Sequence, residues 1–321
     1  MYLSFFRLRE EPFGVTPDPR FLYISPAHQE TFASLQCGIE ANRGFLGLIA
    51  RPGMGKTTIL FNLLERFRAS HRTAFLFNTQ CNSREFMALL LRELGYKGDT
   101  TDFVQLHEEF NKHLLDGLHA GNRVIVVVDE AQNLEPEVLE TVRLLSDFET
   151  PQAKLVHIIL AGQPELADKL ASPGLNQLRQ RMWIVPGLEP LPADEIKKYV
   201  ELRLRVAGHS GYPLFTPEAY EIMAEVTEGI PRNINNFCFH ALSLACALRR
   251  KIVDADIARE VQTDLDIEKL TSSSRPDPAA EAVYSTPLTG IGGDAPQQDD
   301  QLMSPIAAAV YMREIASKLR H

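Results

Sequence analysis

Residues suited to binding a chain of phosphates stand together in the segment ARPGMGKTTIL, at Gly53, Gly55, Lys56 and Thr57. Glycine lets successive backbone N–H groups converge on phosphate oxygens, because no Cβ blocks the approach. A helix that begins at the lysine adds the positive end of its dipole. Since the apolar run Phe45–Ala50 comes directly before, the segment predicts a phosphate-binding loop in which Lys56 contacts the β- and γ-phosphates and Thr57 ligates Mg²⁺.

The other residues of this P-loop complete the expected nucleotide site. Arg51, Pro52, Met54 and Thr58 flank the glycines, so we expect them beside the bound phosphates. The pattern ordinarily opens on glycine, whereas this chain has Ala50 at that position. Alanine is small and stands at the end of the strand, so we expect the loop to keep its shape. The alternative interpretation is a glycine-rich turn that binds no ligand.

Two carboxylates follow the most apolar run of the chain, in the segment RVIVVVDEAQ. Asp129 falls where the buried strand ends, at the edge of a parallel sheet where ligands bind, and could hold Mg²⁺ through water. Glu130 comes next and could orient and deprotonate the water that attacks the γ-phosphate. An Asp-Glu pair alone is equally the polar end of a strand. Its position downstream of the P-loop favours the catalytic interpretation.

Two side-chain amides stand at the ends of neighbouring apolar runs. Gln163 follows Leu155–Gly162 and could contact the γ-phosphate or the attacking water, although it could also bond to a turn. Asn78 ends the run Thr73–Asn78 and could hold Glu130 in an inactive orientation. Asparagine at a strand end is also common turn chemistry, so both interpretations of Asn78 stay open.

Short apolar runs alternate with amphipathic helical patterns between residues 45 and 188, which is typical of a parallel sheet covered on both faces. The expected strands are Phe45–Ala50, Thr73–Asn78, Arg123–Asp129, Leu155–Gly162 and Met182–Leu188. The expected helices are Lys56–Ser70, Ser83–Tyr96, Asp102–Ala120 and Pro136–Phe148. Together they predict a doubly wound α/β domain over residues 45–188.

The strand signal ends after Leu188, and four helical patterns follow over residues 189–269. Thr216 and Asp254 are expected helix N-caps, and Gly229 is an expected stop. These patterns predict a small all-α domain. Residues 270–303 are rich in Ser, Pro, Gly, Gln and Asp, which predicts a disordered linker. Residues 304–321 again show apolar residues on one helical face, so we expect a C-terminal amphipathic helix.

Composition excludes several classes of protein. The 321 residues suit about two domains, and 33 basic against 42 acidic residues give a net charge of −9, which argues against a general polyanion binder but permits a local basic patch. The four cysteines form no CxxC pair, which argues against a zinc site and a disulfide scaffold and suits a reducing cytosol. We expect no membrane span, since no apolar stretch approaches about 18 residues. The charged start MYLSFFRLREEPF is not typical of a secretory signal.

In order along the chain, these motifs resemble those of the AAA+ ATPases, and most closely the ExeA-type family, also known as general secretion pathway protein A. The resemblance rests on TPDPRFLYIS, GKTT, VVVDEAQNL, LAGQPEL, LRQRM and GIPRNIN, and covers residues 1–268. It implies a five-stranded parallel sheet of order 5-1-4-3-2 with a helical lid, and ATP with Mg²⁺ as ligands. It also implies self-association into a ring or filament.

The resemblance assigns further residues. The opening segment, residues 1–44, would lie against the nucleotide, so Phe13 and Pro17–Phe21 are candidates for base contact, although most of these aromatics could simply pack on the core. Arg181 matches an arginine finger supplied to the neighbouring subunit, with Arg179 as second choice; a solvent-facing arginine at a helix end is the alternative. Arg232 matches a second sensor at the start of a lid helix.

The implied function is an ATP-hydrolysing motor or switch that serves secretion, pilus or envelope-polysaccharide assembly through an envelope or secretion-system partner. We expect it in the cytoplasm, with a peripheral place at the inner membrane left open. Long ExeA-type proteins continue into a membrane span and a peptidoglycan-binding domain, whereas this sequence has only the linker and terminal helix.

The second hypothesis is an ATP-gated DNA-binding regulator of the transposition type. A scaffold with negligible turnover is a third, which the presence of Glu130 does not favour.

Overall fold

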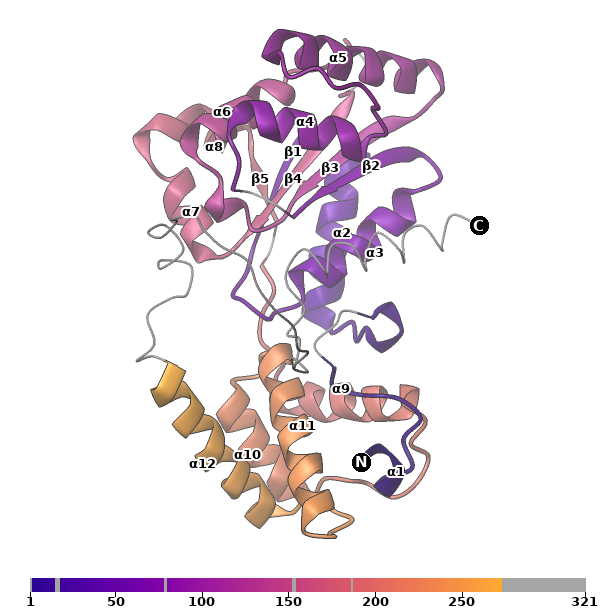
Figure 1. Ribbon diagram of the computed structural model, residues 1–321, viewed down its shortest axis with the longest axis vertical. Coiled ribbons are helices and arrows are strands. Elements are labelled where there is room, and N and C mark those ends of the chain that lie inside the picture. The colour runs from indigo at the N-terminus through magenta and orange to yellow at the C-terminus, as the bar shows by residue number, and fades with distance from the viewer. Residues whose placement is uncertain (1, 15–17, 78–79, 152–153, 186, 273–321) are drawn as a thin grey trace, which may run out of the picture.

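A computed structural model describes residues 2–14, 18–77, 80–151, 154–185 and 187–272. Asn78, Pro17, most of the expected linker and the expected C-terminal helix lie outside the described residues. The chain forms two bodies, an α/β domain and a domain of helices, which we call the lid (Figure 1).

The α/β domain is built on a five-stranded sheet with the order β2-β3-β4-β1-β5, in which neighbouring strands pair in parallel. This is the order 5-1-4-3-2 read from the other edge, so the expected class and strand order are confirmed. The strands are β1 Phe45–Ile49, β2 His71–Leu76, β3 Arg123–Val128, β4 Val156–Gly162 and β5 Trp183–Ile184.

Helices cover both faces of this sheet, as the continuous apolar strands predicted. On one face lie α2 Pro26–Glu40 and α3 Lys56–Phe67. On the other lie α4 Ser83–Glu93, α5 Phe103–His119, α6 Pro136–Leu145, α7 Pro164–Leu170 and α8 Asn176–Arg181 (Figure 1).

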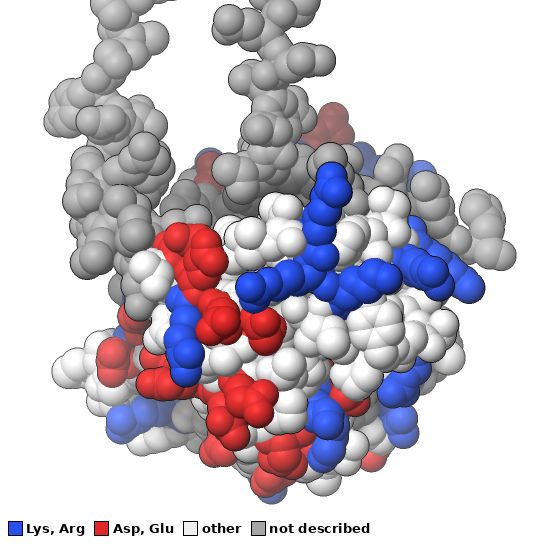
Figure 2. Space-filling model, turned by 90° about the horizontal axis from the view of Figure 1, so that it is seen from below, with Lys and Arg blue, Asp and Glu red and all other residues white. Residues whose placement is uncertain are grey.

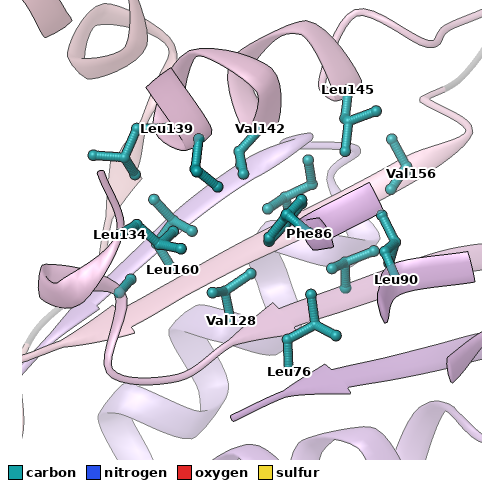
Figure 3. Close-up of a cluster of buried hydrophobic side chains, with 14 of the residues drawn as sticks. Leu76, Phe86, Leu90, Val128, Leu134, Leu139, Val142, Leu145, Val156 and Leu160 are labelled. Carbon is teal, nitrogen blue, oxygen red and sulfur yellow. The ribbon is translucent and has the colours of Figure 1, made fainter. Parts of the chain in front are cut away.

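Strand β3 shows why both faces must be covered. Val124, Val126 and Val128 pack toward α4 and α6, while Ile125 and Val127 pack toward α2 and α3. Successive side chains of a strand point to opposite faces, so a run of valine and isoleucine leaves neither face polar. Figure 3 shows the face covered by α4 and α6, where Phe86 and Leu90 of α4 meet Leu139 and Val142 of α6 above the strands. The buried strands hold the polar residues at their carboxyl ends in fixed positions.

The lid consists of α9 Ala193–Val206, α10 Pro217–Thr227, α11 Pro231–Ala247 and α12 Ala255–Ser272. The Thr216 hydroxyl accepts a hydrogen bond from the N–H of Ala219, and Asp254 Oδ1 accepts one from the N–H of Ile257. Both are N-cap contacts of the expected kind, each worth about 1 kcal/mol. Helix α12 continues to Ser272, so the first residues expected in the linker, from 270, belong to this helix instead.

The N-terminal segment divides between the two bodies. Helix α1 (Tyr2–Phe5) and the buried side chains of Phe6, Leu8, Phe13 and Phe21 share one apolar cluster with the lid helices. The 3₁₀ turn η1 (Pro19–Phe21) contacts α9, whereas α2 packs against α3 in the α/β domain. The segment therefore links the lid to the sheet.

The expected fifth strand, Met182–Leu188, was too long. Only Trp183 and Ile184 pair with β1, at Leu46 and Gly47. Val185 and Leu188 are buried beyond the paired region and pack on the α2–α3 face. Their apolar character reflects burial, which a sequence pattern does not distinguish from strand pairing. No helix within the described residues is both long and apolar enough to cross a bilayer.

Candidate functional site

The P-loop joins β1 to α3 through two glycines in the left-handed region. Gly53 has φ +77° and Gly55, the N-cap of α3, has φ +89°. Side chains with a Cβ are strained in this region, so glycine is required at both turns. A Cβ on Gly53 would also lie 2.7 Å from the Cβ of Arg232 in the lid. The loop is thus folded tightly against α11.

Lys56 is the first residue of α3, and its side chain turns back into the loop. Its Nζ donates to the carbonyl of Ala50 at 3.0 Å and lies 3.5 Å from that of Arg51. Burial lowers the pKa of Lys56, and the carboxylates of Glu130 and Asp129 oppose this shift. Ala50 is itself buried, and its N–H donates to the carbonyl of Gly162. The methyl group of Ala50 packs in the core, so the loop tolerates alanine there.

Thr57 and Asp129 form the second part of the site. The Thr57 hydroxyl donates to Asp129 Oδ2 at 2.6 Å, and the N–H of Glu130 donates to Oδ1 at 2.9 Å. Burial raises the pKa of Asp129, while these two hydrogen bonds and the Lys56 cation act in the opposite direction. A hydroxyl and a carboxylate that converge beside a buried lysine suit a hard divalent cation bound with phosphate oxygens. The residues therefore fit Mg²⁺.

Glu130 follows directly and has an unusual backbone, with φ +52°. Its Oε2 accepts hydrogen bonds from Nε2 of Gln132 at 2.6 Å and from Nε2 of Gln163 at 2.9 Å. Gln163 comes from the end of β4, as its position after Leu155–Gly162 predicted. The structure thus brings the candidate base and the candidate polar sensor into direct contact.

A cavity of ≈ 490 Å³ connects these residues to the lid and the N-terminal segment. Its walls include seven residues of the predicted loop and three other predicted residues. These are Pro52, Gly53, Met54, Gly55, Lys56, Thr57 and Thr58, together with Glu130, Gln163 and Arg232. Arg51 is not among the described lining residues; its Nη1 forms an ion pair with Oε2 of Glu228, in the lid, at 3.1 Å.

Arg232 stands at the first turn of α11 and faces the P-loop. Its N–H donates to the carbonyl of Gly53 at 3.2 Å. Its charge lies close enough to Lys56 to lower the pKa of that amine. Helix α11 enters through Pro231, a residue suited to a first helical turn. The lid therefore contacts the phosphate-binding loop directly through the backbone of the residue predicted as its sensor.

The opposite wall of the cavity comes from the N-terminal segment and α9. Phe21 lines the cavity, and the guanidinium of Arg203 lies 5.0 Å from the centre of its ring. The Arg203 Nε also donates to the carbonyl of Pro12 at 2.6 Å. Phe13, the other aromatic expected near the base, is buried in the lid cluster and does not appear among the described lining residues.

His28 is a site residue that the sequence reasoning missed. It lies in the first turn of α2, is 5% exposed, and its Nε2 lies 3.3 Å from the carbonyl of Met54. Its Nδ1 lies 2.6 Å from the hydroxyl of Ser25. A carbonyl only accepts, so Nε2 carries the proton and Nδ1 accepts from Ser25. Burial lowers the pKa of His28, in agreement with a neutral ring. Ser25 is the N-cap of α2 and Pro26 its first residue, and no sequence signal predicted the contact of His28 with the P-loop.

Arg181 lies at the end of α8 and is not among the described residues that line the cavity. Its side chain is 44% exposed, and its Nη1 forms an ion pair with Asp147. Arg179 is also exposed, on the same short helix. Arg181 is therefore a surface residue and does not belong to the described cavity wall of its own chain.

Comparison with known proteins places these motifs in context. A family model described as an AAA domain matches residues 39–170. General secretion pathway protein A of Aeromonas hydrophila is 40% identical over 260 residues, which cover 80% of this chain and 47% of that protein. An uncharacterized HTH-type transcriptional regulator of Methanocaldococcus jannaschii is 26% identical, over 56% of this chain and 45% of that protein. The chain spans about half the length of these curated relatives.

Solved structures resemble the fold. The ORC2 protein of Aeropyrum pernix, in ADPNP–ADP complexes, has a TM-score of 0.60 at 17% identity, over 79% of this chain and 71% of that one. Drosophila ORC bound to DNA gives 0.62 at 18% identity, over 87% and 70%. The RuvB branch-migration motor of Thermotoga maritima gives 0.53 at 16% identity, over 77% and 73%. At these identities the likeness shows a shared fold.

Proposed function

Because the chain belongs to the AAA+ P-loop proteins of the type represented by general secretion pathway protein A, we propose that it binds ATP with Mg²⁺ and hydrolyses it as an oligomeric motor or switch. The single observation that carries this proposal is the convergence of Lys56, Thr57, Asp129 and Glu130 at one end of a lid-covered cavity.

In this proposal the phosphates lie along the P-loop. Backbone N–H groups around Gly53 and Gly55, the N-terminus of α3 and the Lys56 ammonium stabilise their negative charge. Thr57 and Asp129 would hold Mg²⁺, which supplies charge neutralisation at the phosphate oxygens. Arg51, Pro52, Met54 and Thr58 belong to the same loop, and Arg232 would report the state of the phosphates to the lid.

Glu130 has the role of the general base. Its carboxylate lines the cavity beside Gln163, so it can accept the proton of a water molecule directed at the terminal phosphate. Gln163 can hold the same water or a phosphate oxygen through its amide. The lid and the N-terminal segment enclose the cavity opposite the P-loop and limit the access of other water molecules.

Arg181 would act on the neighbouring subunit. It lies at the surface, and the described residues of the cavity wall do not include it, so its guanidinium is available to an adjacent site after it leaves Asp147. A positive charge supplied at the transferring phosphoryl group is worth about 10³–10⁵ in rate. This division of the site between two chains motivates a ring or filament.

The proposed biological role is taken from the relative of 40% identity, whose name places that relative in a secretion pathway. We propose that this chain serves secretion, pilus or envelope-polysaccharide assembly through an envelope or secretion-system partner. It would act from the cytoplasm, where ATP is available, or at the periphery of the inner membrane.

A DNA-binding regulator ranks second. Arg249, Arg250 and Lys251 are exposed at the end of α11, which supports some affinity for phosphates. Arg250, however, pairs with Asp254 at 3.0 Å. Figure 2 shows the lid end of the molecule with acidic side chains gathered beside the basic ones, rather than one basic surface. Binding to a DNA duplex that weakens steeply with salt would promote this second function.

The proposal is tested by steady-state ATP hydrolysis across a range of protein concentrations. The native chain should hydrolyse ATP with a turnover per subunit that rises with concentration, and Glu130→Gln should lose about 10²-fold or more while still binding ATP. Glu135→Gln, an exposed carboxylate on the same loop, serves as the matched control. A native chain without turnover, or a fully active Glu130→Gln variant, would overturn the proposed function.

A further inference from the structure

The side-chain amide of Gln132 connects the ends of two strands. Gln132 lies in the 3₁₀ turn Ala131–Asn133 that follows β3. Its Nε2 donates to Oε2 of Glu130 at 2.6 Å, and its Oε1 accepts from the backbone N–H of Gln163 at 3.1 Å. The Gln163 side chain in turn donates to the same Glu130 oxygen at 2.9 Å. The three residues form a closed ring of hydrogen bonds.

The chemistry of this ring fixes the orientation of the Gln132 amide. A backbone N–H can only donate, so the amide oxygen must face Gln163. An ionised carboxylate can only accept, so the NH₂ group must face Glu130. Glutamate at position 132 would keep the acceptor but lose the donor, and methionine of similar length would lose both. Glutamine is therefore the side chain of this length that satisfies both neighbours.

Two further contacts support the turn around this amide. The Nζ of Lys169, from α7, donates to the carbonyl oxygens of Gln132 and Leu134 and so holds the backbone of the turn. Gly162 gives the amide room, because a Cβ at that position would lie 2.8 Å from Oε1 of Gln132. Both the backbone and the space around Gln132 are thus arranged for the hydrogen-bonded position.

The backbone of Glu130 explains why such support is needed. With φ +52°, Glu130 has left the extended path of β3, and this conformation is unfavourable for a residue with a side chain. The direction of its carboxylate therefore depends on the groups that hold the carboxylate itself. Glu130 and Gln163 line the cavity, whereas Gln132 is not among the described lining residues.

We propose that Gln132 is a positioning residue, which directs the Glu130 carboxylate toward the attacking water and ties it to the end of β4. It acts through Glu130 and Gln163 rather than on the nucleotide. This inference rests on the proposed ATPase function and adds to it a residue that neither the P-loop nor the Asp-Glu pair identifies.

The kinetic test compares Gln132→Met and Gln132→Glu with the native chain. Both variants should lower kcat by roughly 10- to 100-fold, because a misplaced base loses rate steeply with distance. Their KM for ATP and their melting temperature should stay within the range of the control, Asn133→Ala, an exposed amide on the same turn. In the Glu130→Gln background, Gln132→Met should cause no further loss, since its effect passes through Glu130.

A second measurement needs no nucleotide. Native-state hydrogen exchange of the Gln163 amide should become at least several-fold faster in Gln132→Met, which removes its acceptor, and should be unchanged in Asn133→Ala. If the native chain hydrolyses ATP and the Gln132 variants keep the full kcat, this inference is wrong and the proposed function stands. Unchanged exchange at Gln163 would also overturn it, whether or not the chain turns over ATP. A native chain without turnover would overturn the proposed function, and with it the catalytic part of this inference.

Discussion

The hydroxyl group of Thr57 donates a hydrogen bond of 2.6 Å to Oδ2 of Asp129 and so joins the first turn of α3 to the end of β3. These two residues lie 72 positions apart in the chain. The parallel sheet brings them together, because the carboxyl ends of β1 and β3 meet at the same edge. The contact places a hydroxyl and a carboxylate beside the buried Lys56 amine and forms the centre of the proposed site.

Removing the carboxylate of this pair should weaken binding of the metal more than binding of the nucleotide. In Asp129→Asn, the affinity for Mg²⁺ in the presence of ATP should fall by about 10- to 100-fold, as is usual when an outer partner of a metal is lost. Affinity for ATP in EDTA should change little. Titrations with a fluorescent ATP analogue, with and without Mg²⁺, measure both constants. Equal losses in the two titrations would contradict the proposed metal role of Asp129.

His28 should matter for nucleotide binding although it need not touch the nucleotide. His28→Ala removes the contacts to Met54 and Ser25 in a buried place, which should cost about 1–3 kcal/mol of unfolding free energy. If about 1.4 kcal/mol of this loss falls on the nucleotide-bound conformation of the P-loop, ATP should bind roughly tenfold more weakly. Gln29→Ala, an exposed neighbour on α2, is the control. Calorimetric titration and thermal melts check both effects, and native-like ATP affinity in His28→Ala would refute this role.

The sequence predicted most of the α/β core and the strand–loop–helix conformation of the P-loop. The continuous apolar run at Val124–Val128 predicted a strand covered on both faces, and GKTT after a strand predicted the loop. Such features are local: they depend on side-chain periodicity and on glycine conformations that a few neighbouring residues determine.

Features that depend on distant contacts could not be predicted in this way. Arg203 falls in an expected lid helix. The contact of its guanidinium with the ring of Phe21 could not be predicted, because it forms only where the N-terminal segment packs on α9. Gln132 lies two residues after Glu130 in the sequence. Its positioning role, however, depends on a hydrogen bond from the N–H of Gln163, which follows β4.

His157 should make the protein sensitive to acid. It is fully buried, and its Nδ1 lies 3.4 Å from the carbonyl of Arg43, while its Nε2 has no hydrogen-bond partner among the described groups. Burial lowers the pKa of His157 to about 4, and the nearby side chains of His71, Arg123 and Lys154 act in the same direction.

The sign of this effect follows from proton uptake. The ordinary pKa of histidine is about 6.5. Below that pH, His157 binds a proton in the unfolded chain but not in the folded chain, so the free energy of unfolding is greatest above pH 6.5 and falls as the pH drops toward 4. The loss should be on the order of 3 kcal/mol. Urea unfolding from pH 4 to 8 measures it, with His157→Leu as the comparison. If both proteins lose the same free energy over this range, His157 is not the cause.

Arg181 should act across a subunit boundary. Arg181→Ala keeps Glu130, and Glu130→Gln keeps Arg181, so each variant alone should hydrolyse ATP slowly. A mixture of the two should regain part of the native turnover, because some sites combine an intact Glu130 with an intact Arg181 from the neighbour. Rates measured against the mixing ratio at fixed total protein check this expectation. Purely additive rates would show that Arg181 does not complete a shared site.

The most direct test of the whole account is calorimetric titration of Mg²⁺ and ATP into the native chain and into Lys56→Ala. We expect the native chain to bind one nucleotide. We expect no measurable binding by Lys56→Ala, whose unfolding should still be cooperative in thermal melts. Absence of uptake by the native chain, or equal affinity in the two proteins, would contradict a nucleotide site between the P-loop and Asp129.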